Sequence, residues 1–289
     1  MRPLMNIAFL NDTYLPIEQA QISPLDRGFL FGDGIYEVVP SYAGKLVGFK
    51  PHIERMNHGL NAIGITTSWS EKQWLDLCLR LVEENGSGNL GIYLHISRGT
   101  YGSRVHKFPE KVNPTIFAFC FEIPPPPTAD KARAKTYTVS TALDKRWGHR
   151  HIKSTSLLGN VMHYQQGIDQ GNSETLLYNA DNELTEASSC NVFIVKNGTV
   201  ATPPLDNQKL AGVTRQILID ILRQQSSIEV QERVITMDEV ATADEVWVTS
   251  SSREIAPVIA IDSNPVGDGQ VGDIWLAAQT LYSANRFNY

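Results

Sequence analysis

Four consecutive prolines, Pro124 to Pro127, restrict the folding of this chain more than any other feature. Proline lacks a backbone N–H and has a fixed φ, so the run favours an extended spacer over a helix or a paired strand. The length of 289 residues also favours two domains. We therefore predict a small N-terminal α/β domain over residues 1–123, a linker over 124–128 and a large C-terminal domain over 129–289.

Strand and helix patterns occur on both sides of this boundary. The N-terminal part predicts strands at 7–10, 13–17, 90–97 and 115–122, a strand after Gly34, and helices at 51–63 and 71–84. The C-terminal part predicts strands at 134–141, 174–179, 191–195, 200–202, 228–233, 245–249 and 256–261, and helices at 157–170, 210–225, 237–243 and 271–289. This mixture predicts an α+β or mixed α/β protein whose sheets need not be parallel.

Charge and hydropathy exclude several classes of protein. The chain has 25 basic and 31 acidic side chains, a net charge of −6 that argues against a nucleic-acid backbone binder. No apolar run reaches the roughly 20 residues of a membrane helix, and polar residues interrupt any signal-peptide core near the start, at Asn6, Asn11 and Asp12. We therefore expect small-molecule partners, with no nucleic acid and no membrane.

The cysteines indicate the compartment and exclude an obvious metal centre. Cys78, Cys120 and Cys190 are scattered and lack the spacing of a metal site. Unpaired cysteines are typical of a reducing environment, so we expect a cytoplasmic protein. His149 and His151 have no partner at ligand spacing, and we expect no metal.

A charged turn between a strand pattern and a helix pattern contains the candidate nucleophile, Lys153. The run 136–141 predicts the strand and 157–170 predicts the helix. If Lys153 is buried, its pKa falls, and the free amine can form a Schiff base with an aldehyde or ketone. By itself, the pattern favours a solvated basic turn over a Schiff-base lysine.

Chemistry based on pyridoxal phosphate would require an acid for the pyridine nitrogen, a phosphate site and a group for the substrate carboxylate. Glu186 could supply the acid. The helix start at 212–214 offers backbone donors to a phosphate, the hydroxyls of 250–252 could add to them, and Arg55 could supply a countercharge. Each of these residues would also fit an ordinary turn or surface position.

Two further segments are unusual. Residues 26–39 contain three glycines within seven positions, which predicts tight turns, but their spacing matches neither a P-loop nor a dinucleotide-binding motif. This segment leads into a strand that contains Tyr36. A later loop gathers three cationic residues within nine positions, at Arg98, Arg104 and His106.

In their order along the chain, these motifs resemble the fold type IV pyridoxal-phosphate enzymes. That family includes branched-chain aminotransferases, D-amino-acid aminotransferases and aminodeoxychorismate lyase. The resemblance covers nearly the whole chain and rests on the segments 26–28, 31–37, 53–55, 152–154, 158–160, 184–186, 188–189, 191–193, 212–215 and 248–250. It implies the two-domain fold of that family, a bound pyridoxal phosphate and a homodimer.

The resemblance also implies a role for each candidate site residue. Lys153 would form the Schiff base and move the proton between the substrate Cα and the cofactor, while Glu186 would pair with the pyridine nitrogen. Leu210 would pack against the cofactor ring. The phosphate would be held by Arg55, the backbone amides of Val213 and Thr214, and the hydroxyls of Ser250 and Ser251.

Within the family, the chain is most similar to the D-amino-acid aminotransferases. These carry an arginine and a histidine at the positions of Arg104 and His106 and a tyrosine at that of Tyr36, which together bind the substrate α-carboxylate. The resemblance therefore implies ping-pong transfer of an amino group from a D-amino acid to a 2-oxo acid such as 2-oxoglutarate or pyruvate. A branched-chain L-amino-acid transaminase, an (R)-amine transaminase and an aminodeoxychorismate-type lyase are the alternatives. The resemblance assigns no role to Arg98.

Overall fold

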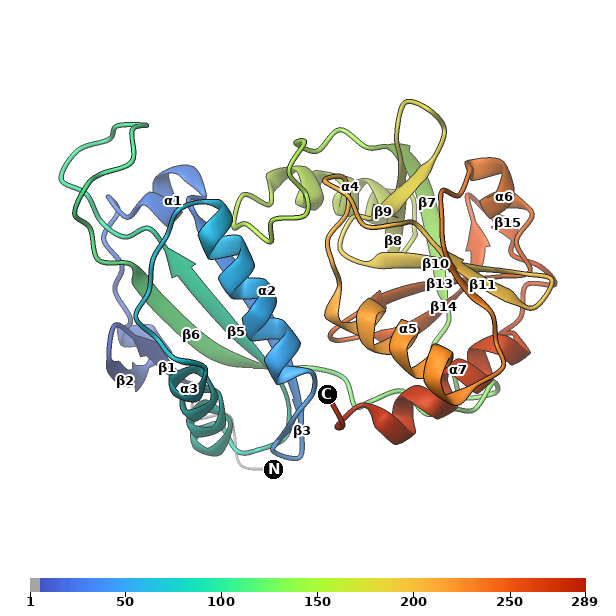
Figure 1. Cartoon of the computed structure of the whole chain (residues 1–289), viewed down its shortest axis with the longest axis horizontal. Coiled ribbons are helices and arrows are strands. Elements are labelled where there is room, and N and C mark those ends of the chain that lie inside the picture. The colour runs from blue at the N-terminus through green and yellow to red at the C-terminus, as the bar shows by residue number, and fades with distance from the viewer. Residues whose placement is uncertain (1–5) are drawn as a thin grey trace. The chain divides into compact units, whose positions relative to one another are not determined.

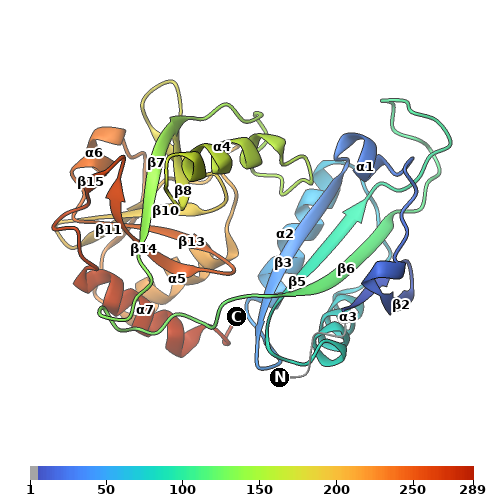
Figure 2. The same ribbon diagram turned by 180° about the vertical axis from the view of Figure 1, so that it is seen from behind.

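The computed structural model describes residues 6–289, which form two compact units (Figures 1 and 2). The division falls between Pro125 and Pro126, inside the proline run. The second unit continues to Asn288, but the segment Ile152–Leu157 belongs to the first. No helix in the described chain combines the length and the apolar character that a membrane span requires.

The placement of Ile152–Leu157 corrects the sequence-based boundary, which assigned residues 129–289 to one domain. The N–H of Tyr36 donates to the carbonyl of Lys153 over 3.1 Å. Ile35 and Ser154 form an isolated antiparallel bridge, and Ile152 joins the apolar core of the first unit. Because these contacts link residues more than a hundred positions apart, no local pattern could predict them.

The first unit is built on a six-stranded sheet in the order β2-β1-β6-β5-β3-β4, with every neighbouring pair antiparallel. Helices α2 and α3 cover one of its faces (Figures 1 and 2). The elements are β1 (Ile7–Leu10), β2 (Thr13–Pro16), η1 (Ile17–Gln19), α1 (Arg27–Phe31), β3 (Gly34–Tyr42), β4 (Lys45–Leu46), α2 (Phe49–Ala62), α3 (Glu71–Glu84), β5 (Asn89–Ser97) and β6 (Thr115–Glu122).

Helix α3 shows how sequence sets a local element. Ser70 accepts from the N–H of Gln73, and the Gln73 side chain accepts from the N–H of Ser70, which completes a capping box. Trp74, Cys78 and Leu81 then recur at helical spacing and are fully buried against the sheet. The helix therefore spans the predicted residues.

The second unit contains a mixed nine-stranded sheet in the order β12-β11-β10-β13-β14-β7-β8-β9, with β15 beside β14. The pairs β11–β12, β14–β7 and β7–β8 are parallel. Its strands are β7 (Tyr137–Leu143), β8 (Glu174–Tyr178), β9 (Leu184–Ala187), β10 (Asn191–Lys196), β11 (Thr199–Thr202), β12 (Val230–Glu232), β13 (Glu245–Ser250), β14 (Glu254–Ile261) and β15 (Asn264–Pro265). Its helices are α4 (Leu158–Asp169), α5 (Val213–Gln225), α6 (Met237–Ala241) and α7 (Asp273–Asn285).

The glycine-rich segment forms a short helix, α1, that periodicity did not predict. The Asp26 carboxylate accepts from the N–H of Gly28 at the start of the helix, and Gly32 ends it in the left-handed conformation. A Cβ at Gly32 would lie 2.3 Å from Oγ of Ser156. Glycine is therefore required at this position both for its positive φ and for the close approach of the segment that contains Lys153.

Candidate active site

The candidate nucleophile and Tyr36 meet in the first unit. Lys153 is half-buried, and its Nζ donates to the Tyr36 hydroxyl over 3.1 Å. The same Nζ lies 4.2 Å from the centroid of the Tyr36 ring. The strand β3 positions Tyr36, and backbone pairing to this strand positions Lys153. Tertiary structure thus joins the predicted base to one of the three predicted carboxylate ligands.

Arg55 lies in a buried cluster that the sequence analysis did not foresee. It donates from Nε to Oε1 of Glu37 and from Nη2 to Oε2, each over 2.7 Å, and Nδ1 of His52 lies 2.7 Å from Oε2. Burial opposes ionisation of Glu37, but the adjacent Arg55 and His52 lower its pKa to about 2. The Glu37 carboxylate therefore fixes the direction of the Arg55 guanidinium. Two sequence features point toward this cluster: the alternation of side chains along the strand that contains Glu37, and the i, i+3 spacing of His52 and Arg55.

Arg104 and His106 lie in the exposed loop between β5 and β6. The guanidinium carbon of Arg104 lies 5.1 Å from the centroid of the Phe31 ring, and the His106 ring lies 5.3 Å from it. Within one chain, over residues 6–289, no hydrogen bond joins either residue to Tyr36 or Lys153. Within the described part of one chain, the three predicted carboxylate ligands are therefore not joined by hydrogen bonds.

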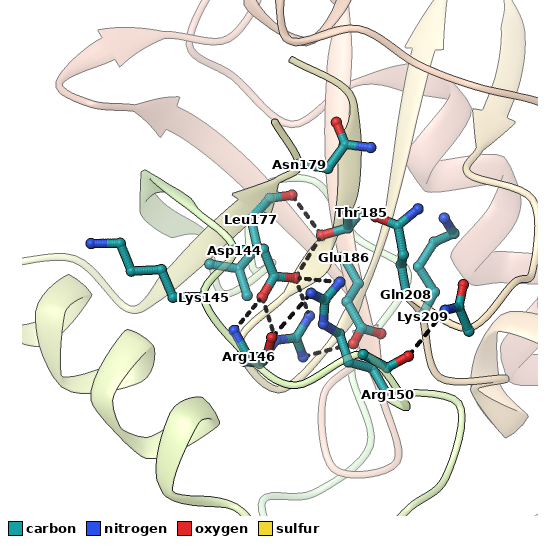
Figure 3. Close-up of polar contacts among 12 residues, drawn as sticks. Asp144, Lys145, Arg146, Arg150, Leu177, Asn179, Thr185, Glu186, Gln208 and Lys209 are labelled. Atoms are coloured by element: carbon teal, nitrogen blue, oxygen red, sulfur yellow. Dashed lines mark hydrogen bonds and ion pairs between the residues drawn. The ribbon is translucent and has the colours of Figure 1, made fainter. Parts of the chain in front are cut away.

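Glu186 is buried on β9 in the second unit and has donors on both of its oxygens. Figure 3 shows one of these donors, Arg146. Oε1 accepts from Nη1 of Arg146 over 2.8 Å. Oε2 accepts from the N–H of Leu210 over 3.0 Å and from Nδ2 of Asn191 over 3.3 Å. Burial raises the pKa of Glu186, while the charge of Arg146 acts in the opposite direction. These three donors hold the carboxylate in one orientation.

A second carboxylate holds Arg146 in place. Asp144, whose side chain is 1% exposed, accepts from Nη2 of Arg146 over 2.7 Å and from Nε over 3.0 Å, and Arg150 Nη1 lies 3.2 Å from it. Although burial opposes ionisation, hydrogen bonds from Arg146 lower the pKa of Asp144. Figure 3 shows this network, with Lys145 pointing away from it. The sequence analysis noted the charged turn but could not predict its pairing.

Asn191 links Glu186 to the start of helix α5. Its Nδ2 also donates to the carbonyl of Leu210 over 2.8 Å. A Cβ at Gly212 would lie 1.9 Å from Asn191 Oδ1, so only glycine fits there. In the sequence, Asn191 belongs to one of the segments that carry the family resemblance, but no local pattern predicts this link.

The start of α5 and the end of β13 supply further candidate phosphate donors. Gly212 is the N-cap residue of α5 and provides no side-chain cap for the amides of Val213 and Thr214. Asn191 pairs with Thr249 between β10 and β13, directly before Ser250. The second unit therefore places Glu186, Leu210, the helix start and the end of β13 around Asn191.

The Glu186 carboxylate and the start of α5 both fit the chemistry of pyridoxal phosphate. A carboxylate offers about four acceptor positions, and three donors occupy those of Glu186, which leaves room for one more N–H. An uncapped helix N-terminus suits a phosphate dianion. The roles of the individual residues, including Ser251, remain predictions.

Comparison with known proteins identifies the family. A family model described as amino-transferase class IV matches residues 34–261. The chain belongs to the class IV aminotransferases. D-alanine aminotransferases from Staphylococcus epidermidis and Staphylococcus aureus are each 36% identical to it over 271 residues, which cover 93% of this chain and 94% of theirs. One from Listeria monocytogenes is 33% identical over 267 residues, covering 92% of this chain and 91% of its own.

Solved structures of this class support the fold. A branched-chain amino acid aminotransferase from Escherichia coli has a TM-score of 0.89 at 20% identity, covering 97% of this chain and 94% of its own. One from Thermoproteus uzoniensis has a TM-score of 0.88 at 21% identity, with 98% and 95% covered. The predicted fold type IV architecture is confirmed, and so are the predictions of an aminotransferase and of pyridoxal phosphate as its cofactor.

Proposed function

We propose that this class IV aminotransferase acts on D-amino acids, transferring their amino group to a 2-oxo acid such as 2-oxoglutarate or pyruvate in a ping-pong cycle. The observation that carries the proposal is the hydrogen bond between Lys153 Nζ and the Tyr36 hydroxyl. This contact supports the proposal, because it joins the proposed base to the hydroxyl of a proposed ligand for the substrate carboxylate. The name shared by the bacterial relatives, D-alanine aminotransferase, supports the same substrate class.

When bound, pyridoxal phosphate supplies an electron sink for the bond that breaks at the substrate Cα. The Lys153 amine would hold the cofactor covalently and would then move the Cα proton. Glu186 would accept a hydrogen bond from the pyridine nitrogen, and Arg146 keeps the Glu186 carboxylate in position. The phosphate would be bound by Arg55, by the amides of Val213 and Thr214, and by the hydroxyls of Ser250 and Ser251. Leu210 would pack against the ring.

The substrate carboxylate is bound by Tyr36, Arg104 and His106. A guanidinium can donate two parallel hydrogen bonds to a carboxylate, and a histidine can add a third. Placing the carboxylate on this side directs the Cα hydrogen of the D-enantiomer toward Lys153. An amine without a carboxylate would leave these donors unused.

A panel of half-reactions tests the substrate class. With no 2-oxo acid present, D-alanine is expected to convert the absorbance band of the bound cofactor to that of the pyridoxamine form, and pyruvate should appear in equal amount. L-leucine, L-valine and (R)-1-phenylethylamine serve as comparisons. Conversion by the L-amino acids alone would instead support a branched-chain transaminase, and continued release of pyruvate without an amino acceptor would support a lyase.

We also propose a homodimer, in which the loop of one subunit completes the site of the other. Two observations support it: Arg104 and His106 make no hydrogen bond to Tyr36 or Lys153 within residues 6–289 of one chain, and helix α4 exposes an apolar face. That face includes Leu158 (73% exposed), Val161 (59%) and Met162 (65%), which share the i, i+3, i+4 spacing of one helix side.

Sedimentation equilibrium checks the dimer. The expected mass is twice the 32.1 kDa of one chain. Val161→Glu should shift the enzyme toward the monomer, because a buried unpaired charge is costly in an interface. Leu79→Glu, at an apolar position on α3 that is 43% exposed, is the control and should leave the mass unchanged. A wild-type monomer with full activity would contradict the proposal.

The cysteines support a proposal for the enzyme's compartment. All three cysteines are buried and free. Free thiols persist in a reducing environment, and we infer that the enzyme works in the cytoplasm on small amino and 2-oxo acids.

A further inference from the structure

We propose that Asp26, Arg27, Asp33 and Arg98 form a clamp that positions the recognition loop, residues 99–114, for binding the substrate carboxylate. The inference rests on the proposed function, because Arg104 and His106 lie in this loop. It gives a role to the glycine-rich segment 26–39 and to Arg98, whose roles the sequence left unassigned. The clamp residues act through the loop and make no contact with the substrate.

Asp26 forms hydrogen bonds with the residues at both ends of the loop. It is 2% exposed, and its Oδ1 accepts from Oγ of Ser97, the last residue of β5, over 2.6 Å. Its Oδ2 accepts from Oγ1 of Thr115, the first residue of β6, also over 2.6 Å. One buried carboxylate thus holds the two strand ends from which the loop emerges.

Arg27 holds the part of the loop that carries the recognition residues. It is 3% exposed, and Nη1 donates to the carbonyl of Val105 over 2.6 Å, while Nη2 donates to that of His106 over 3.3 Å. Nη1 also lies 3.5 Å from the carbonyl of Lys107. Because Arg27 binds main-chain carbonyls, it positions the backbone and leaves the side chains of Arg104 and His106 exposed.

Asp33 orders the two arginines of the clamp. Its Oδ2 accepts from Nε of Arg27 and from Nε of Arg98, each over 2.7 Å, and its Oδ1 accepts from Nη2 of Arg98 over 2.9 Å. Arg98 also donates to the carbonyls of Ile63 and Gly64, over 2.6 and 3.0 Å, just after α2. The clamp is thereby attached to the helical layer of the first unit.

Arg98 adds a second point of attachment to the loop. Its guanidinium carbon lies 3.6 Å from the centroid of the Phe108 ring, and that of Arg27 lies 6.0 Å from the same ring. Phe108 is 55% exposed, so this contact and not burial in a core holds it in place. The attachments made by Arg27 and Arg98 therefore fall on consecutive residues, 105–108.

These attachments matter for recognition because the loop is exposed. An exposed loop is ordinarily mobile, so without the clamp its binding side chains would have to be ordered each time a substrate carboxylate binds. A preorganised backbone lets Arg104 and His106 meet a carboxylate without a further ordering cost. Loosening the clamp should therefore weaken substrate binding more than it slows the chemical step.

The test measures the half-reaction with D-alanine in the holoenzyme, using Arg27→Lys and Phe108→Ala. Lysine preserves the charge next to Asp33 but lacks the fork that binds two carbonyls. Phe108→Ala removes only an exposed ring, so it should fold and can test the proposal if Arg27→Lys does not fold. In each variant the apparent dissociation constant for D-alanine should rise at least about tenfold, with the limiting rate changed less than about threefold. Lys111→Ala, at an exposed position of the same loop, is the control and should match the wild type.

A second readout separates positioning from a purely structural role. Hydroxylamine attacks the bound cofactor and has no carboxylate, so its reaction rate and the cofactor's absorbance band should not change in either variant. Unchanged D-alanine binding in both variants would overturn the clamp, as would an equal loss of reactivity toward D-alanine and hydroxylamine. Wild-type enzyme that reacts with hydroxylamine but not with D-alanine would overturn the proposed function, and the clamp's role in it.

Discussion

The Lys153→Ala enzyme is expected to lose transamination by at least about 10²–10⁴-fold, the usual contribution of a positioned acid–base group. The loss should be greater still because, in the proposed mechanism, the same amine also holds the cofactor covalently. Nζ of Lys153 lies 3.1 Å from the Tyr36 hydroxyl, and alanine would leave no amine at this position. Turnover of D-alanine with 2-oxoglutarate measures the change.

The control for this variant is Lys145→Ala in the same turn, whose side chain is exposed and points away from the charged network (Figure 3). It should retain wild-type turnover and cofactor absorbance. In Lys153→Ala, the absorbance band of the covalently bound cofactor should be missing, although cofactor held by the phosphate site should still co-purify. Turnover within a few-fold of the wild type would remove Lys153 from its assigned role.

The Glu186→Gln enzyme is expected to lose about 10- to 150-fold in turnover, because a hydrogen bond to a charged group contributes about 1.5–3 kcal/mol. A neutral amide cannot hold a positive charge on the pyridine nitrogen as a carboxylate does. The amide nitrogen would also face one of the donors that Glu186 now accepts from, Arg146 or the Leu210 N–H. Urea unfolding of the variant therefore accompanies the kinetic measurement.

The pH profile gives an independent test of Glu186. In the proposed mechanism the ionised form of Glu186 is the active one, so the rate should fall as pH falls through the pKa of Glu186. Because burial raises that pKa, the acid limb should lie at higher pH than an ordinary glutamate would give. Glu186→Gln should lack this limb, and Glu183→Gln, at a half-buried position three residues earlier, should retain it. An identical acid limb in Glu186→Gln would assign the titration to another group.

Local patterns predicted the elements whose determinants lie within a few residues. Helix α3 has its capping box at Ser70 and its apolar spacing in the sequence itself, and it spans the predicted residues. The Asn197-Gly198 turn was predicted in the same way, since both residues have positive φ and Lys196 pairs with Thr199 across it. Helix α1 was missed because a five-residue helix with glycine inside it has too little periodicity to detect.

The sequence by itself determined the family and the cofactor, and it suggested Lys153 as the candidate base, because motif order and residue type do not depend on three-dimensional coordinates. Only the tertiary structure decided that Ile152–Leu157 leaves the C-terminal unit to pair with β3, since that pairing forms over a long sequence separation. It also decided which charges meet: Glu37 with Arg55, and Glu186 with Arg146. The sequence gives the number and positions of the charged side chains. Which of them pair depends on which are buried next to each other in the folded protein.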